Sequence, residues 1–215
     1  MAHHSSLITV SLSPMELQSQ DAVAVLQFPE EPLYPRLATP VLRELASLFT
    51  RLARDNVFRG VVIASNSCSF ATGAEVQEVS MLHAVRACEF ARQGQNLCRQ
   101  IRIFPVPVVA AIRGFCFGGG LDLALACHAR IATYNTSFAY PGGGLGLITG
   151  WGGTQSLPRK FGKAAALEVL LTGERIPATQ VVSLRLVDDL VSSEELLSAA
   201  VQRVHTLLER RSEHS

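Results

Sequence analysis

Two glycine-bearing turns are the parts of this sequence best suited to chemistry. One reads Thr72-Gly73-Ala74-Glu75, and the other reads Phe117-Gly118-Gly119-Gly120-Leu121-Asp122. Because glycine has no Cβ, its backbone N–H can approach a bound atom closely. The first N–H groups of a following helix have no partner within the helix, and the helix dipole adds positive charge there. Such turns can hold an anion, or an oxygen that becomes negative in a reaction. The alternative is that these glycines only allow close packing.

Few side chains near these turns could move a proton or attack a substrate. Asp122 falls in the first turn of the expected helix, where the dipole favours a carboxylate whatever its role. Tyr140 precedes a proline in the next glycine-dense segment and could donate a hydrogen bond or simply pack. Cys116 lies beside the triplet but lacks a patterned histidine partner, which a cysteine nucleophile needs.

Other familiar sites are excluded by their spacing. The stretch 142–146 reads GGGLG and lacks the third glycine of a dinucleotide fingerprint, and Gly162-Lys163 is followed by alanine rather than Ser or Thr. The hydrolase turn GxSxG does not occur. No His, Cys, Asp or Glu residues have metal-ligand spacing, so we expect no metal site.

Length and composition favour a single domain and point to neither nucleic acid nor a membrane as a partner. The chain has 215 residues, 48% of them apolar, and a net charge of +1. Without a basic run, neither nucleic acid nor an anionic membrane is an expected partner. No apolar stretch reaches transmembrane length, and no secretory signal is recognisable. Five cysteines without a CxxC pair fit free thiols in a reducing compartment, so a cytoplasmic protein is expected.

The elements that would position the glycine turns alternate along the chain. Strands are expected at 7–12, 22–28, 61–64, 108–112, 130–134 and 187–191, with a polar connection between the first two. Helices are expected at 41–54, 81–104, 121–129, 155–161, 163–172, 177–186 and 193–211. This alternation is typical of an α/β fold. Both glycine turns follow a strand and precede a helix, so they should meet at one edge of the sheet, on neighbouring strands.

Several motifs occur together, in the order FATGAE (70–75), AIRG (111–114), GGGLD (118–122), GWGGTQSLPR (150–159), LTGERI (171–176) and LVD (186–188). In these motifs the sequence resembles the crotonase, or enoyl-CoA hydratase/isomerase, superfamily over nearly its whole length. The resemblance implies a spiral of ββα units over 1–190, with a C-terminal helix and tail over 191–215. The C-terminal helical region is expected to be shorter than in relatives. A homotrimer or a dimer of trimers is the expected assembly.

The resemblance also implies a ligand and a site. The ligand would be a thioester of coenzyme A or of an acyl-carrier protein, with coenzyme A as part of the substrate and no permanently bound cofactor. The backbone N–H groups of Ala74 and Gly119 would form an oxyanion hole. Thr72 would lie beside the adenine with Ala74, and Met81 would border the acyl pocket. The remaining substrate-binding positions would be Gly73, Gly118, Tyr140 and Gly142.

The acid and base residues depart from the family pattern. Hydratases of the family use two glutamates, and this chain has Asp122 and Gly142 at those positions. The resemblance implies a lyase or isomerase of fatty acid metabolism that stabilises an enolate-like intermediate, with Asp122 as the catalytic carboxylate. Isomerisation or decarboxylation would need fewer carboxylates than hydration. An acyl-CoA-binding protein that has lost catalysis and a purely structural subunit are the alternatives.

Overall fold

Two β-sheets form the framework of the molecule. The computed structural model describes residues 10–12 and 15–213. The larger sheet consists, in spatial order, of β1 (Val10–Leu12), β2 (Met15–Gln20), β3 (Val23–Phe28), β4 (Gly60–Ser65), β5 (Val108–Ile112), β7 (Ala129–Thr133) and β10 (Asp189–Val191). Its first three strands are antiparallel, and the pairs from β3 to β10 are parallel. The smaller sheet contains β6 (Phe115–Phe117), β8 (Ser137–Ala139) and β9 (Ile176–Pro177).

Consecutive turns of the chain place one strand in each sheet. After β5 the chain enters β6 and then a helix, and after β7 it enters β8 and then a 3-10 helix. Strands β6 and β8 are parallel to each other, as are β5 and β7. The chain therefore advances as a spiral of ββα units, the arrangement that the resemblance implies.

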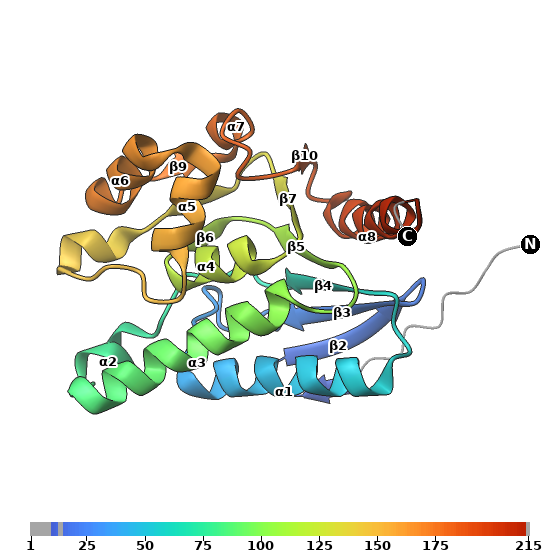
Figure 1. Cartoon of the computed structure of the whole chain (residues 1–215), viewed down its shortest axis with the longest axis horizontal. Coiled ribbons are helices and arrows are strands. Elements are labelled where there is room, and N and C mark those ends of the chain that lie inside the picture. The colour runs from blue at the N-terminus through green and yellow to red at the C-terminus, as the bar shows by residue number, and fades with distance from the viewer. Residues whose placement is uncertain (1–9, 13–14, 214–215) are drawn as a thin grey trace, which may run out of the picture.

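Helices cover the larger sheet on both sides (Figure 1). They are α1 (Thr39–Asp55), α2 (Val76–Ser80), α3 (Ala84–Arg102), α4 (Gly119–Ala126), the 3-10 helix η1 (Pro141–Leu145), α5 (Gly153–Phe161), α6 (Lys163–Thr172), α7 (Ala178–Val181) and α8 (Leu196–Ser212). Helix α8 packs on β4, β5 and β7, and α1 packs against α3. Alternate strand residues serve the two faces: Val62 and Val109 pack with α8, whereas Ile63 belongs to the main core. Burial on both faces explains why these strands are continuously apolar.

Three expectations from the sequence need correction. The polar connection after residue 12 contains the strand β2, whose residues after Met15 are only half-buried and therefore accept polar side chains. The helix expected at 177–186 is confined to α7, because the chain turns after it and Arg185 takes a left-handed φ of 55°. Helix α4 begins at Gly119, inside the triplet, and ends at Ala126. The first part of the strand expected at 7–12 lies outside the described residues.

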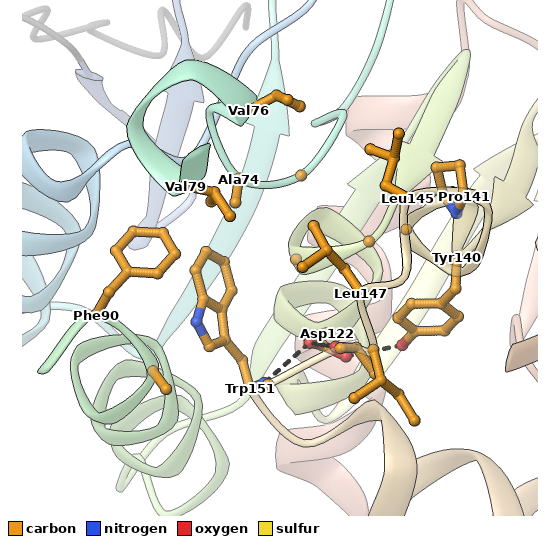
Figure 2. A pocket seen from close by; sticks show the side chains of 18 of the residues that line it. Ala74, Val76, Val79, Phe90, Asp122, Tyr140, Pro141, Leu145, Leu147 and Trp151 are labelled. Atoms are coloured by element: carbon orange, nitrogen blue, oxygen red, sulfur yellow. Dashed lines mark hydrogen bonds between the residues drawn. The ribbon is translucent and has the colours of Figure 1, made fainter. Parts of the chain in front are cut away.

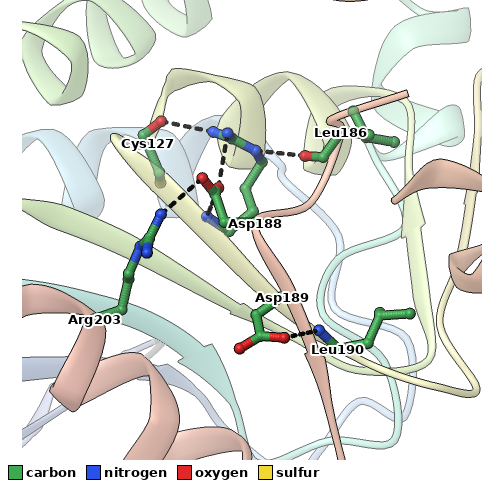
Figure 3. A network of polar contacts seen from close by, with 7 residues as sticks. Cys127, Leu186, Asp188, Asp189, Leu190 and Arg203 are labelled. Carbon is green, nitrogen blue, oxygen red and sulfur yellow. Dashed lines mark hydrogen bonds and ion pairs between the residues drawn. The ribbon is translucent and has the colours of Figure 1, made fainter. Parts of the chain in front are cut away.

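A buried guanidinium ties the last strand and helix to the core. Arg130 on β7 donates to the carbonyl oxygens of Leu186 (2.6 Å) and Cys127 (2.9 Å) and to the Asp188 carboxylate (3.0 Å). Asp188 also accepts from Arg203 on α8 at 3.1 Å (Figure 3). Arg130 is only 4% exposed, so Asp188 supplies the countercharge that its burial requires.

Candidate functional site

A cavity of about 320 Å³ opens where the two glycine turns meet. Apolar side chains form most of its walls: Val76, Val79, Leu82 and Phe90 from α2, α3 and the segment between them, and Leu145, Leu147 and Ile148 from η1 and the loop after it (Figure 2). Among the described residues, the ionisable side chains that line it are those of Asp122 and Tyr140. The cavity thus offers apolar volume beside a small number of polar groups, as small-molecule sites usually do.

The two glycine turns lie against each other because the strands before them pair. Ala71 forms a parallel bridge with Cys116, and the Phe117 N–H donates to the Ala71 carbonyl at 2.9 Å. Gly73 and Gly118 take φ values of 97° and 49°, which disfavour side chains. A Cβ added to Gly73 would lie 3.3 Å from the Gly119 amide nitrogen. Glycine at position 73 therefore lets the two turns approach this closely.

Two amides in these turns have no protein acceptor. Across residues 10–12 and 15–213, neither the Ala74 N–H nor the Gly119 N–H donates to another protein group. Gly119 is the first residue of α4, so its N–H has no acceptor within the helix. Both residues line the cavity. A ligand oxygen held there could accept from both amides.

Asp122 forms the floor of the cavity and is surrounded by donors. It is 3% exposed and accepts from the Tyr140 hydroxyl at 2.8 Å, the Trp151 N–H at 3.3 Å and the Thr149 hydroxyl. Figure 2 shows its carboxylate between Trp151 and Tyr140. Burial raises the pKa of Asp122, while hydrogen bonds from Thr149, Tyr140 and the Trp151 and Gly153 amides oppose that rise.

Tyr140 faces the cavity as a neutral phenol. Burial, followed by the charge of Asp122, raises the pKa of Tyr140 well above its ordinary value. Its hydroxyl therefore acts as a hydrogen-bond donor toward Asp122.

Trp151 covers the second glycine turn. A Cβ added to Gly119 would lie 2.2 Å from the Trp151 Cζ3, and one added to Gly94 would lie 2.3 Å from Cδ1. The ring is 6% exposed and lies 5.4 Å from the Phe90 ring, centroid to centroid. The indole therefore fills the space between α3 and the start of α4.

The structure brings most of the predicted site residues together. The cavity is lined by Thr72, Gly73, Ala74, Gly118, Gly119, Asp122, Tyr140 and Gly142. Met81 is not among its lining residues: it follows the short helix α2, is 83% exposed, and leaves its neighbour Leu82 to line the cavity. Sequence reasoning missed Trp151, Thr149 and Phe90, although Trp151 is the single tryptophan of the chain and lies in the glycine-rich loop.

Other sites considered from the sequence find no support in the described residues. Cys116 is fully buried, and burial raises the pKa of its thiol well above the ordinary value, which disfavours the nucleophilic thiolate. Within the same residues, no three His, Cys, Asp or Glu side chains are grouped closely enough to hold a metal ion. Every helix in this part of the chain is too short or too polar to span a lipid bilayer.

The raised pKa of Asp122 predicts a pH-dependent stability. Because the folded protein holds this proton more tightly than the unfolded chain, protonation of Asp122 stabilises the fold. We compare the wild type with Asp122→Asn by urea unfolding at several pH values. The wild type minus variant difference in unfolding free energy should be largest below about pH 3.9, the unperturbed aspartate value. It should fall as the pH rises through the raised pKa. A difference that grows with pH would contradict this assignment.

Comparison with known proteins gives one consistent picture. The model of the enoyl-CoA hydratase/isomerase family matches residues 18–215. Solved structures that superpose well include an enoyl-CoA hydratase from Bacillus anthracis, 27% identical, with a TM-score of 0.85 over 91% of this chain and 76% of that one. DspI from Pseudomonas aeruginosa is 29% identical, with a TM-score of 0.86 over 95% of this chain and 78% of that one. An enoyl-CoA hydratase subunit from Geobacillus kaustophilus is 28% identical, with a TM-score of 0.84 over 90% and 75%.

Proposed function

The chain belongs to the enoyl-CoA hydratase/isomerase family, and on that premise we propose that it binds an acyl-CoA thioester in the cavity between its two glycine turns. The observation that carries this proposal is the pair of cavity-lining amides, Ala74 N–H and Gly119 N–H, which have no acceptor among the described residues. The thioester carbonyl oxygen would accept from both. Coenzyme A then enters as part of the substrate rather than as a resident cofactor.

Two fixed donors at this oxygen favour one class of reaction. When a thioester loses its α-proton, gains a nucleophile at its β-carbon or loses carbon dioxide, negative charge gathers on the carbonyl oxygen. A donor that is already in place stabilises that charge without reorganisation, and one such donor contributes roughly 3 kcal/mol. An enolate-like intermediate is therefore the species that the cavity would stabilise best.

The walls of the cavity argue against ordinary hydration. Adding water across a double bond requires a positioned base and acid within about 3 Å of the protons that move. The second carboxylate is absent at Gly142, and apolar residues such as Leu145 and Leu147 line that side of the cavity. We therefore favour isomerisation or decarboxylation of a thioester with an apolar acyl group, carried by coenzyme A or an acyl-carrier protein.

A second candidate is thioester binding without turnover. Three protein donors already share the two oxygens of Asp122, and the residue is 3% exposed, so it is poorly placed to accept a substrate proton. A homotrimer or dimer of trimers is the assembly we propose for either function. Leu167 and Leu171 of α6, 57% and 66% exposed, provide apolar area for contacts between copies.

A panel of thioesters tests the proposal. Saturated, 2-enoyl, 3-enoyl and carboxylated acyl-CoA esters are titrated by calorimetry, and each mixture is analysed for products by mass spectrometry. We expect saturable binding of thioesters with apolar acyl groups, and conversion of 3-enoyl or carboxylated esters rather than hydration. Binding without any conversion would select the second candidate. Absence of binding by every thioester would refute both.

A further inference from the structure

Asp122 is the carboxylate of the proposed site, yet its contacts connect parts of the protein. Its three donors come from two places: the Tyr140 hydroxyl after β8, and the Thr149 hydroxyl and the Trp151 backbone N–H in the loop before α5. An ionised carboxylate has about four acceptor positions on its two oxygens. The Tyr140 hydroxyl donates to one oxygen of Asp122, and Thr149 and Trp151 both donate to the other.

The loop that Asp122 holds carries Trp151, whose indole lies against Gly119. The ring lies close to Gly119 of α4 on one side and to Gly94 of α3 on the other, so a Cβ at either position would meet it. Within the described residues, the backbone N–H of Trp151 donates to the Asp122 carboxylate, and the indole ring of Trp151 packs on Phe90. Displacement of residues 149–153 would carry the indole away from the turn that presents the Gly119 amide.

We propose that Asp122 is a positioning residue, which fastens residues 149–153 and thereby keeps Trp151 packed on the Gly119 turn of the oxyanion hole. Asp122 then contributes to thioester binding through Trp151 and Gly119, without removing a proton from the substrate, so of the two favoured reactions this inference retains decarboxylation, which needs no base. The part of this inference that concerns thioester affinity rests on the proposed function. The part that concerns the packing of Trp151 can be tested without any ligand.

The single tryptophan makes the inference measurable in the ligand-free protein. Asparagine at position 122 keeps the shape of aspartate but turns one oxygen into an NH2 donor, which cannot accept from a backbone N–H. The remaining oxygen of asparagine can still face Thr149 and Trp151, but a neutral amide oxygen accepts less strongly than a carboxylate, so Asp122→Asn should loosen the loop in part. Thr149→Val removes one donor from the same loop and leaves the Asp122 side chain in place. Asp189→Asn makes the same chemical change at an exposed position on β10 and serves as the matched control.

Acrylamide quenching of Trp151 reports exposure of the indole rather than local charge. We expect quenching to increase in Asp122→Asn and, less strongly, in Thr149→Val, with wild-type quenching in Asp189→Asn. The Kd of a thioester that binds the wild type should rise about tenfold in Asp122→Asn, the loss that one well-formed hydrogen bond represents.

Three outcomes would overturn the inference. Wild-type quenching and Kd in Asp122→Asn, with turnover alone lost, would identify Asp122 as a proton acceptor. Wild-type values in every assay would show that its contacts hold nothing in place. Increased quenching with an unchanged Kd would show that the position of the loop does not affect thioester binding at the oxyanion hole. Should Asp122→Asn fail to fold by circular dichroism, the quenching and Kd of Thr149→Val decide. If no thioester binds the wild type, the proposed function fails, and quenching alone still tests the fastening of the loop.

Discussion

Gly119→Ala is expected to lower kcat/KM for a turned-over thioester by about 10²- to 10³-fold, the usual effect of losing one oxyanion donor. The new Cβ would lie 2.2 Å from the Trp151 Cζ3, far inside contact distance. The indole cannot retreat easily, because Gly94 and Phe90 lie against it. The glycine turn must therefore move, and the Gly119 N–H would no longer point at the oxygen to which the Ala74 N–H also donates. Steady-state kinetics measures the loss, and thioester affinity replaces it if the protein only binds.

Gly144→Ala is the matched control for this variant. Gly144 lies in η1, and a Cβ added there would meet no atom within 4 Å. It should retain wild-type kinetics and affinity. If Gly119→Ala behaved like Gly144→Ala, the Gly119 amide could not be the donor that the proposed function requires.

Asp188→Asn is expected to lower the free energy of unfolding by about 3 kcal/mol. Breaking a buried ion pair from one side is costly because the remaining charge stays buried without a partner. The Arg130 side chain is 5% exposed and that of Asp188 is 24% exposed, so the expected loss lies at the lower end of the range for buried pairs. Asparagine keeps one oxygen, so one of the two arginines, Arg130 or Arg203, would face an NH2 group in place of its acceptor. Urea unfolding at neutral pH measures the change.

Glu75→Gln removes a carboxylate from the exposed pair with Arg36 and is the control for Asp188→Asn. The Arg36 side chain is 53% exposed, and exposed pairs usually contribute at most about 1 kcal/mol. The two losses should therefore differ clearly. Equal losses in the free energy of unfolding would mean that burial of the Arg130 partner does not increase the contribution of Asp188 to stability.

Local patterns predicted the parts of the fold that present the cavity. The apolar runs at 61–64 and 108–112 predicted two buried strands, and these pair as β4 and β5. The glycines at 73 and 118–120 predicted that backbone comes close to another group at the ends of strands. In the structure that group is, in part, the other glycine turn. Short-range sequence signals sufficed here because strand ends and helix starts are set by neighbouring residues.

Residues that act through distant contacts were beyond such reasoning. Thr149 and Trp151 reach Asp122 across 27 and 29 positions of sequence, through a loop whose path no local pattern predicts. The polar residues of β2 predict a connection rather than a strand, because its half-buried positions accept polar side chains. The family pattern predicts Met81 at the acyl pocket, but this residue follows α2 and is 83% exposed, and Leu82 lines the cavity instead.

The carbonyl stretching frequency of a bound thioester tests the central claim most directly. Isotope-edited infrared difference spectra of a ¹³C=O acyl-CoA report the hydrogen bonds to that one oxygen. Two donors from Ala74 and Gly119 predict a frequency well below that of the same ester in water. Gly144→Ala should preserve this shift, and Gly119→Ala should lose most of it. A bound ester that absorbs at its solution frequency in the wild type would contradict the account.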